Sequence, residues 1–151
     1  MRRTLLVTND FPPKVGGIQS YLWELWRRLP AEGVAVYTTP YPGATDFDRA
    51  QGFALQRSPE SVLLPYPWLP GRIGQLAGQH EADLVIWDPA VPLGLAARYV
   101  DRPYGVVLHG SEVTVPGRLP VSRALLARVL DGASLVICAG GYPAAEAERA
   151  V

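Results

Sequence analysis

Residues 5–29 read LLVTNDFPPKVGGIQSYLWELWRRL, and their pattern already indicates the class of fold. Its start, Leu5–Thr8, is a short and mostly apolar run, which is typical of a parallel strand buried on both faces. Residues 9–17 follow as a loop that ends in Gly16-Gly17. From residue 18 to residue 29 the apolar side chains return at a spacing of three and four, which predicts an amphipathic helix. A buried strand, a glycine-containing loop and a helix in this order are typical of the start of an α/β domain.

The same alternation continues along the chain. Apolar runs predict further strands over residues 34–39, 53–57, 84–87, 104–108 and 135–138. Periodic apolar spacing or a proline in the first turn predicts helices over residues 72–80, 92–99 and 122–130 and from residue 143 onward. Ser122 is the expected cap of the third of these helices. The prolines between residues 40 and 71 argue against regular structure in most of that stretch. We therefore expect an α/β fold with an open parallel sheet.

Length and composition narrow the class of protein. The chain has 151 residues, 48% of them hydrophobic, which is enough for one folded domain. Fourteen basic residues balance fourteen acidic ones, and this balance argues against nucleic-acid binding. The single cysteine, Cys138, excludes an intramolecular disulfide and favours a reducing compartment. No apolar run is long enough for a signal peptide or a membrane span, so a cytoplasmic protein is expected.

In an open parallel sheet, ligands bind at the carboxyl ends of the strands. The residues that follow the predicted strands are therefore the candidates for a site. They are Asn9-Asp10, Gly16-Gly17, Trp87-Asp88, His109-Gly110 and residues 139–142.

Two of these candidates have a specific chemistry. Gly16-Gly17 precedes a helix, so free main-chain N–H groups there suit a phosphate, although a loop that needs positive φ would also explain the pair. His109 follows a buried strand and is placed to contact a ligand, although it would equally serve to order its own loop. Two histidines, one cysteine and no clustered carboxylates argue against a metal site.

The four tryptophans divide by position. Trp26 and Trp87 fall at core positions of a predicted helix and strand. Trp23 lies off the apolar stripe of its helix, and Trp68 lies in the proline-rich stretch, so both are candidates for exposure. An exposed tryptophan beside arginines suits a membrane interface or a partner domain.

Four stretches of the chain, taken in order, resemble one enzyme family. They are Val7–Leu22, Leu63-Leu64-Pro65, Trp87–Leu95 and Leu108–Val113. Together they are similar to the corresponding parts of retaining family-4 glycosyltransferases, and within these to actinobacterial phosphatidylinositol mannosyltransferases. The chain departs from the family pattern at Ser111. It has His109-Gly110-Ser111-Glu112 where the motif of the most similar mannosyltransferases resembles His-Gly-His-Glu.

The resemblance implies that residues 1–151 are the Rossmann-like N-terminal half, on the acceptor side, of a two-domain GT-B enzyme whose C-terminal donor-binding domain is absent. Such an enzyme moves a sugar, here mannose, from a nucleotide-sugar donor such as GDP-mannose to a lipid or glycoconjugate acceptor, as part of phospholipid metabolism. Transfer proceeds with retention and without a metal or other cofactor. The half alone is expected to be inactive.

The resemblance also assigns roles to individual residues. Gly16 and Gly17 would lie against the diphosphate of the donor, and His109 would contact the transferred sugar. Asp10, Gln19 and Tyr21 become candidate contacts for the acceptor. A lipid acceptor further implies peripheral association with the inner face of the cell membrane.

The sequence also allows a second hypothesis on the function of the chain. The chain would then be a non-catalytic Rossmann-like module that docks with a partner chain, through the apolar stretch Leu63–Leu69. A reading frame that continues past Val151 into a second Rossmann-like domain would favour the enzyme, and a stop codon would favour the module or a split enzyme.

Overall fold

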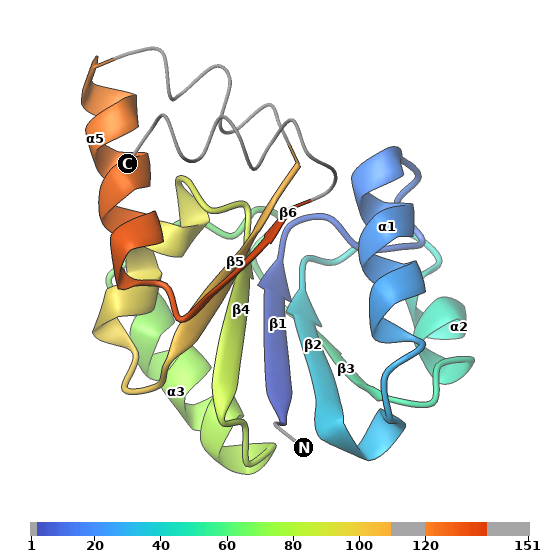
Figure 1. Cartoon of the computed structure of the whole chain (residues 1–151). Helices are drawn as coiled ribbons and strands as arrows, with labels where there is room; N and C mark the ends of the chain where they lie inside the picture. The colour runs from blue at the N-terminus through green and yellow to red at the C-terminus, as the bar shows by residue number, and fades with distance from the viewer. Residues whose placement is uncertain (1–2, 110–119, 139–151) are drawn as a thin grey trace.

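The structure is a computed structural model, and it describes residues 3–109 and 120–138. These residues form one six-stranded parallel sheet with the strand order β3-β2-β1-β4-β5-β6 (Figure 1). The strands are β1 Thr4–Thr8, β2 Val34–Thr38, β3 Ala54–Arg57, β4 Leu84–Asp88, β5 Tyr104–Leu108 and β6 Leu135–Cys138. All six predicted strands are present within one or two residues, and the expected open parallel α/β sheet is confirmed.

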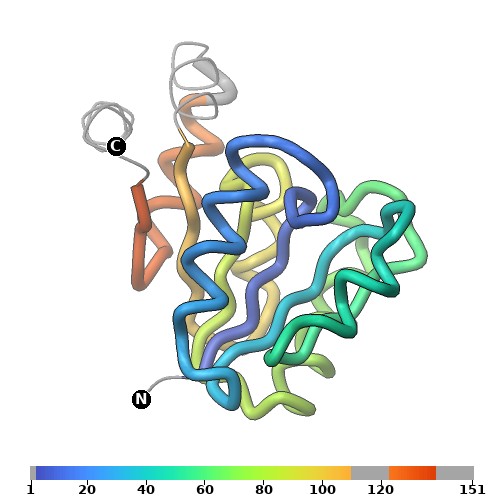
Figure 2. Tube along the Cα trace, turned by 90° about the vertical axis from the view of Figure 1, so that its right-hand side faces the viewer, coloured from blue at the N-terminus to red at the C-terminus, as the bar shows by residue number. Residues whose placement is uncertain are grey.

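Helices cover both faces of this sheet. The α-helices are α1 Gly17–Trp26, α2 Ala44–Arg49, α3 Leu69–Gln79 and α5 Pro120–Gly132, and the 3₁₀ helices are η1 Ala31–Gly33 and η2 Leu93–Tyr99. Figure 1 places α1 and α2 on one side of the sheet and α3, η2 and α5 on the other. Figure 2 looks from the side of α1 and shows this helix running lengthwise along the strands, with α2 to one side of it.

The period of two along each strand divides the core between these two layers. Leu5 and Val7 of β1 belong to the cluster that α3, η2 and α5 cover, whereas Leu6 belongs to the cluster under α1. In β4, Trp87 faces the α3 side and Ile86 faces the α1 side. The same alternation determines which helix layer a polar side chain at the end of a strand faces.

The helices depart from the predictions at several points. Helix α1 ends at Trp26 and not at residue 29, and α3 begins at Leu69, with Pro70 in its first turn, and not at residue 72. Helix α2 was not predicted at all. Helix α5 begins at Pro120, so Ser122 lies inside the helix and its expected role as the cap is wrong. The helix predicted from residue 143 lies outside the described residues.

The predicted burial of the tryptophans is largely confirmed. Trp26 and Trp87 are buried in the core, and Trp68 is 53% exposed. Trp23 is half-buried, and its indole N–H donates to Gln51 Oε1 at 2.9 Å.

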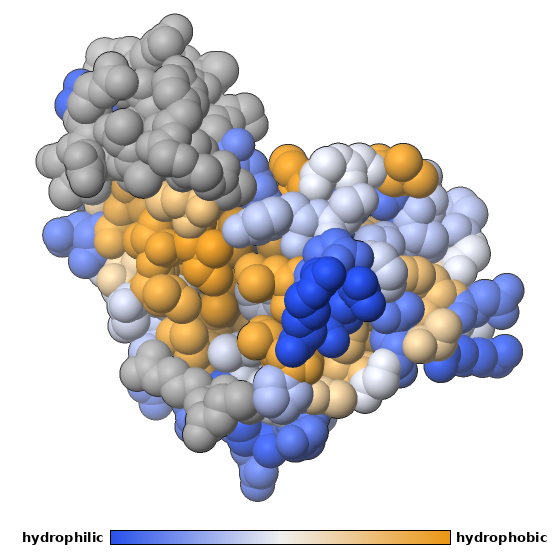
Figure 3. All heavy atoms as spheres, turned by 45° about the vertical axis from the view of Figure 1, so that its right-hand side comes forward, coloured by the Kyte–Doolittle hydropathy of each residue, from blue (hydrophilic) through white to orange (hydrophobic). Residues whose placement is uncertain are grey.

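The edge strand β6 is less buried than the other apolar strands. Leu135 is 42% exposed, and Cys138 is half-buried against the core. Figure 3 shows, on the side of the molecule that carries α1, a broad apolar area next to the atoms drawn in grey. The polar ends of β1, β4 and β5 lie deeper in the sheet, and they form the candidate site.

Candidate functional site at the carboxyl edge of the sheet

Asp88 is a buried carboxylate at the end of β4. It pairs in register with Thr8 at the end of β1, and the period of two turns both side chains toward α1. The hydroxyl of Thr8 donates to Asp88 Oδ2 over 2.7 Å, and both residues are fully buried. A buried carboxylate is stable only when hydrogen-bond donors surround it, and Thr8 supplies one of them.

His109 supplies the second donor. It follows β5 directly, and its Nε2 lies 2.8 Å from Asp88 Oδ1. The side chains of His109 and Asp88 are only 7% and 1% exposed. The ring of Tyr21, from α1, meets the imidazole edge to face with 5.8 Å between the centroids. Asp88 and Tyr21 therefore fix the imidazole from two directions.

The loop after β1 is tied to the same group of residues. The main-chain N–H of Asp10 donates to Thr8 Oγ1 over 2.9 Å. The side-chain amide of Gln19 donates to Asp10 Oδ1 over 3.2 Å, and Lys14 Nζ lies 3.8 Å from the same oxygen. Asp10, Gln19 and the Thr8–Asp88–His109 chain thus form one connected polar system.

The glycine pair begins α1 at this edge. Gly16 has extended backbone, with φ of 163°, and the one described glycine in the left-handed region of positive φ is Gly43, with φ of 83°. The explanation of the pair by positive φ is therefore wrong. A Cβ on Gly16 would lie 2.1 Å from Gln19 Oε1, whereas a Cβ on Gly17 would meet no atom of residues 3–109 and 120–138 within 4 Å. The close approach of Gln19 accounts for the first glycine, and no contact within the described residues accounts for the second.

The structure brings the predicted site residues together in two contacts. Asp10 contacts Gln19, and Tyr21 contacts His109, while Gly16 and Gly17 begin the helix that carries Gln19 and Tyr21. His80 lies away from this group, at the end of α3, where its carbonyl accepts a hydrogen bond from Arg3. Within residues 3–109 and 120–138, no three His, Cys, Asp or Glu side chains gather as metal ligands would.

Sequence reasoning missed the roles of Thr8 and Asp88. Asp88 was among the residues at strand ends, but neither residue was given a function. One feature of the sequence points to a role for both, because each is a polar residue at the end of a mostly apolar, buried strand. Once β1 and β4 are taken as neighbours, the alternation of side chains puts Thr8 and Asp88 on the same face.

Comparison with known proteins identifies the class. Residues 15–150 match the model of Glycosyltransferase Family 4, and the chain therefore belongs to that family. A GDP-mannose-dependent alpha-(1-6)-phosphatidylinositol monomannoside mannosyltransferase of Mycobacterium tuberculosis is 42% identical over 153 residues, and the match covers 94% of this chain and 39% of the relative. A mannosyltransferase of Mycolicibacterium smegmatis with the same description is 36% identical and is covered to 38%. The chain thus spans about two-fifths of the length of these relatives.

Solved structures share the fold. HepE of Anabaena, in its complex with UDP, matches 98% of this chain and 40% of its own length with a TM-score of 0.69 and 18% identity. The complex of the same protein with UDP-glucose gives a TM-score of 0.69 as well. The sheet described above therefore corresponds to one Rossmann-like half of a GT-B glycosyltransferase.

Proposed function

We propose that residues 1–151 form the N-terminal, acceptor-side domain of a retaining glycosyltransferase that transfers mannose from GDP-mannose to a lipid-linked acceptor. A second, C-terminal domain would hold the nucleotide. The observation that carries the proposal is the buried Asp88–His109 pair, 2.8 Å apart, at the edge of the sheet where α1 begins with Gly16-Gly17. The names of the relatives support the choice of donor and acceptor.

Gly17 is the residue of this domain that would approach the diphosphate of the donor. It is the first residue of α1, where main-chain N–H groups and the helix dipole favour an anion. No atom of the part of the chain that the structure describes would meet a Cβ on Gly17, and the absence of a side chain would let a phosphate come close to the main chain. As the bond between the sugar and the diphosphate breaks, negative charge grows on the leaving group, and donors already in place stabilise that charge.

His109 would contact the sugar that is transferred. In retaining transfer without a covalent intermediate, the bond from the anomeric carbon to the diphosphate breaks while the acceptor oxygen bonds to the same face of that carbon. The acceptor proton goes to a diphosphate oxygen. Asp88 and Tyr21 would keep the imidazole in place, so that little reorganisation accompanies the reaction.

Asp10, Gln19 and Tyr21 would form the acceptor side. Gln19 is 7% exposed and donates to Asp10, so a buried amide holds the Asp10 carboxylate at the edge of the sheet, where an acceptor would be bound. Tyr21 is only partly buried and contacts His109, which would place an acceptor hydroxyl near the transferred sugar.

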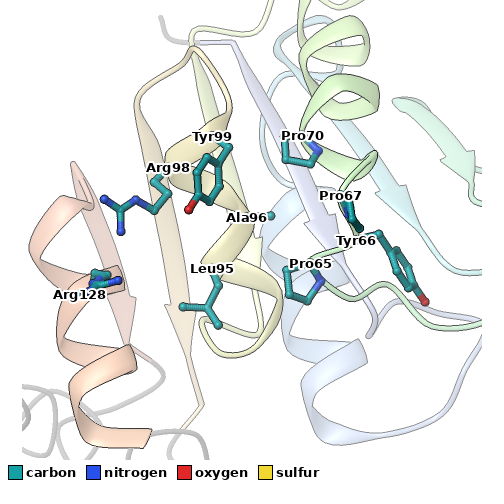
Figure 4. A pocket seen from close by; sticks show the side chains of 9 residues that line it. All are labelled: Pro65, Tyr66, Pro67, Pro70, Leu95, Ala96, Arg98, Tyr99 and Arg128. Carbon is teal, nitrogen blue, oxygen red and sulfur yellow. The ribbon is translucent and has the colours of Figure 1, made fainter. Parts of the chain in front are cut away.

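A lipid acceptor requires the domain to work at a membrane surface. No helix within the described parts of the chain is long and apolar enough to cross a bilayer. A pocket of about 410 Å³ lies between the stretch Pro65–Pro70 and η2, and Arg98 and Arg128 lie on one side of it (Figure 4). Near it, Trp68 and Tyr99 are 53% and 71% exposed. Exposed aromatic rings with adjacent arginines suit the boundary between acyl chains and anionic headgroups, so this face would contact the membrane.

Transfer by a completed enzyme tests the proposal. The chain is joined to the C-terminal half of the M. tuberculosis relative, and movement of labelled mannose from GDP-mannose to phosphatidylinositol monomannoside is measured. We expect transfer with retained anomeric configuration by the joined protein and none by the chain alone. The control is the relative's own two halves joined at the same point. If that control is active and the joined protein is not, or if the product is inverted, the proposal is wrong.

A further inference from the structure

We propose that Thr8 and Asp88 are positioning residues that hold the imidazole of His109 in one tautomer, with its proton on Nε2. The catalytic consequence rests on the proposed function, but the tautomer itself does not. The inference depends on three hydrogen bonds in series, Asp10–Thr8, Thr8–Asp88 and Asp88–His109. In each of them, one partner determines whether the other donates or accepts.

The direction of the chain is set by the main chain of Asp10. A peptide N–H can only donate, so Thr8 Oγ1 accepts from Asp10 N over 2.9 Å. The single proton of the Thr8 hydroxyl is then available to Asp88 Oδ2, 2.7 Å away. Asp88 therefore accepts at this oxygen.

The remaining oxygen, Asp88 Oδ1, lies 2.8 Å from His109 Nε2. A carboxylic acid is ordinarily a stronger acid than an imidazolium, so the proton between them belongs to the nitrogen. Thr8 and Asp88 are fully buried and the His109 side chain is 7% exposed, so water has little access to this chain. Nε2–H is thus the donor, as is usual where a carboxylate orients a histidine.

The tautomer determines what the other ring nitrogen can bind. In the neutral ring, Nδ1 carries the lone pair, so a hydrogen-bond partner at that atom has to be a donor. A sugar hydroxyl meets this requirement, and a carbonyl or ether oxygen does not. Asp88 would therefore determine whether the partner of Nδ1 has to donate or to accept, without touching that partner.

Nitrogen-15 NMR of the imidazole rings measures the tautomer directly in the chain of residues 1–151, because protonated and unprotonated ring nitrogens differ strongly in chemical shift. The spectrum is recorded at a pH high enough to keep the rings neutral. The chain has two histidines, so a His80→Gln variant assigns the signals of His109. We expect the proton on Nε2 of His109, and a proton on Nδ1 would overturn the proposal.

Asp88→Asn gives a sharper result. The Thr8 proton still needs an acceptor, so the introduced carbonyl oxygen turns toward Thr8 and the introduced NH₂ turns toward His109. Nε2 then has to accept, and the ring proton is expected to move to Nδ1. A Thr8→Ser variant keeps the hydroxyl and should keep the wild-type tautomer. An unchanged tautomer in Asp88→Asn would show that Asp88 does not set it.

Kinetics of the joined two-domain protein test the consequence. Asp88→Asn should lower kcat by about 10- to 100-fold while KM for GDP-mannose changes little, because the group that is misplaced acts in the transition state. His80→Gln, at the end of α3 and away from the site, should stay near the wild-type kcat. A wild-type kcat in Asp88→Asn overturns the catalytic consequence. If wild-type transfer is itself absent, the proposed function fails, and the NMR result still decides the tautomer.

Discussion

Asn9 and Leu63 are joined by two hydrogen bonds between positions 54 residues apart in the chain. The side-chain amide of Asn9 donates to the Leu63 carbonyl over 2.8 Å, and its oxygen accepts from the Leu63 N–H over 2.7 Å. Leu63 is fully buried, so its peptide groups have no access to water. This pairing fastens the proline-rich crossing stretch to the loop that carries Asp10.

Asn9→Ala should therefore destabilise the domain. Each lost hydrogen bond to a buried peptide group costs about 1 kcal/mol, so a loss of about 2 kcal/mol in the free energy of unfolding is expected. Urea unfolding followed by circular dichroism measures it. Gln75→Ala, an amide exposed on α3, is the matched control and should change stability by less than about 0.5 kcal/mol. Equal stability of the two variants would contradict the structural role of Asn9.

The phenol of Tyr104 fastens α5 to the sheet. Its hydroxyl donates to the carbonyl of Val129 over 2.6 Å, and Tyr104→Phe should cost about 1 kcal/mol in the free energy of unfolding. Tyr41→Phe, at an exposed tyrosine, should leave stability unchanged. A stability equal to wild type in Tyr104→Phe would contradict this role.

The same residue gives a pH dependence. Burial raises the pKa of Tyr104, with a smaller raising effect from Asp131 and a lowering effect from Arg98. Because folding favours the neutral phenol, its contribution to stability is complete below the unfolded pKa near 10 and is lost as the pH rises through the folded pKa. Urea midpoints measured at rising alkaline pH should fall more steeply in the wild type than in Tyr104→Phe. Parallel curves would contradict the assignment.

Gly16 and Gly17 should respond differently to a methyl group. In Gly16→Ala the new Cβ would displace Gln19. In Gly17→Ala it meets no described residue, so the stability of the free chain should stay within about 1 kcal/mol of the wild type. In the joined two-domain enzyme, Gly17→Val should raise KM for GDP-mannose by about tenfold or lower the rate, because the side chain would block the approach of a phosphate. Wild-type kinetics in Gly17→Val would remove this residue from the donor site.

The pocket of Figure 4 predicts selective binding to anionic membranes. The chain should sediment with vesicles that contain phosphatidylinositol and less with vesicles of phosphatidylcholine alone, since arginines near a surface contribute about 1 kcal/mol each. Trp68→Ser and the pair Arg98→Glu and Arg128→Glu should weaken this binding, and Tyr41→Ser should not. Equal binding by all of these variants would place the membrane contact elsewhere.

Much of the fold could be predicted because buried parallel strands leave a strong local signal, as Leu84–Trp87 does. The helix α2 left no such signal. It has six residues, less than two turns, so no period of 3.6 develops, and it starts after Gly43, whose φ of 83° is typical of a turn. The start of α3 is hard to predict because Pro70 favours a break in regular structure, although proline is well tolerated in the first turn of a helix.

The candidate site was predicted only in part, for a different reason. His109 could be found alone, since it follows a strand. Its partners are distant along the chain. Asp88 precedes His109 by 21 residues, and Thr8 precedes Asp88 by 80 residues. Such a contact depends on the order and register of the strands, and the sequence pattern of a single strand carries no information on either.

In the proposed function, His109 is held by Asp88 and contacts the sugar that is transferred. The most direct test compares turnover of His109→Ala and His80→Ala in the joined two-domain enzyme, after circular dichroism has shown that both variants are folded. We predict that His109→Ala lowers turnover by about 100-fold and that His80→Ala leaves it unchanged, because only the first removes a group from the site. Wild-type turnover in a folded His109→Ala protein would contradict the claim.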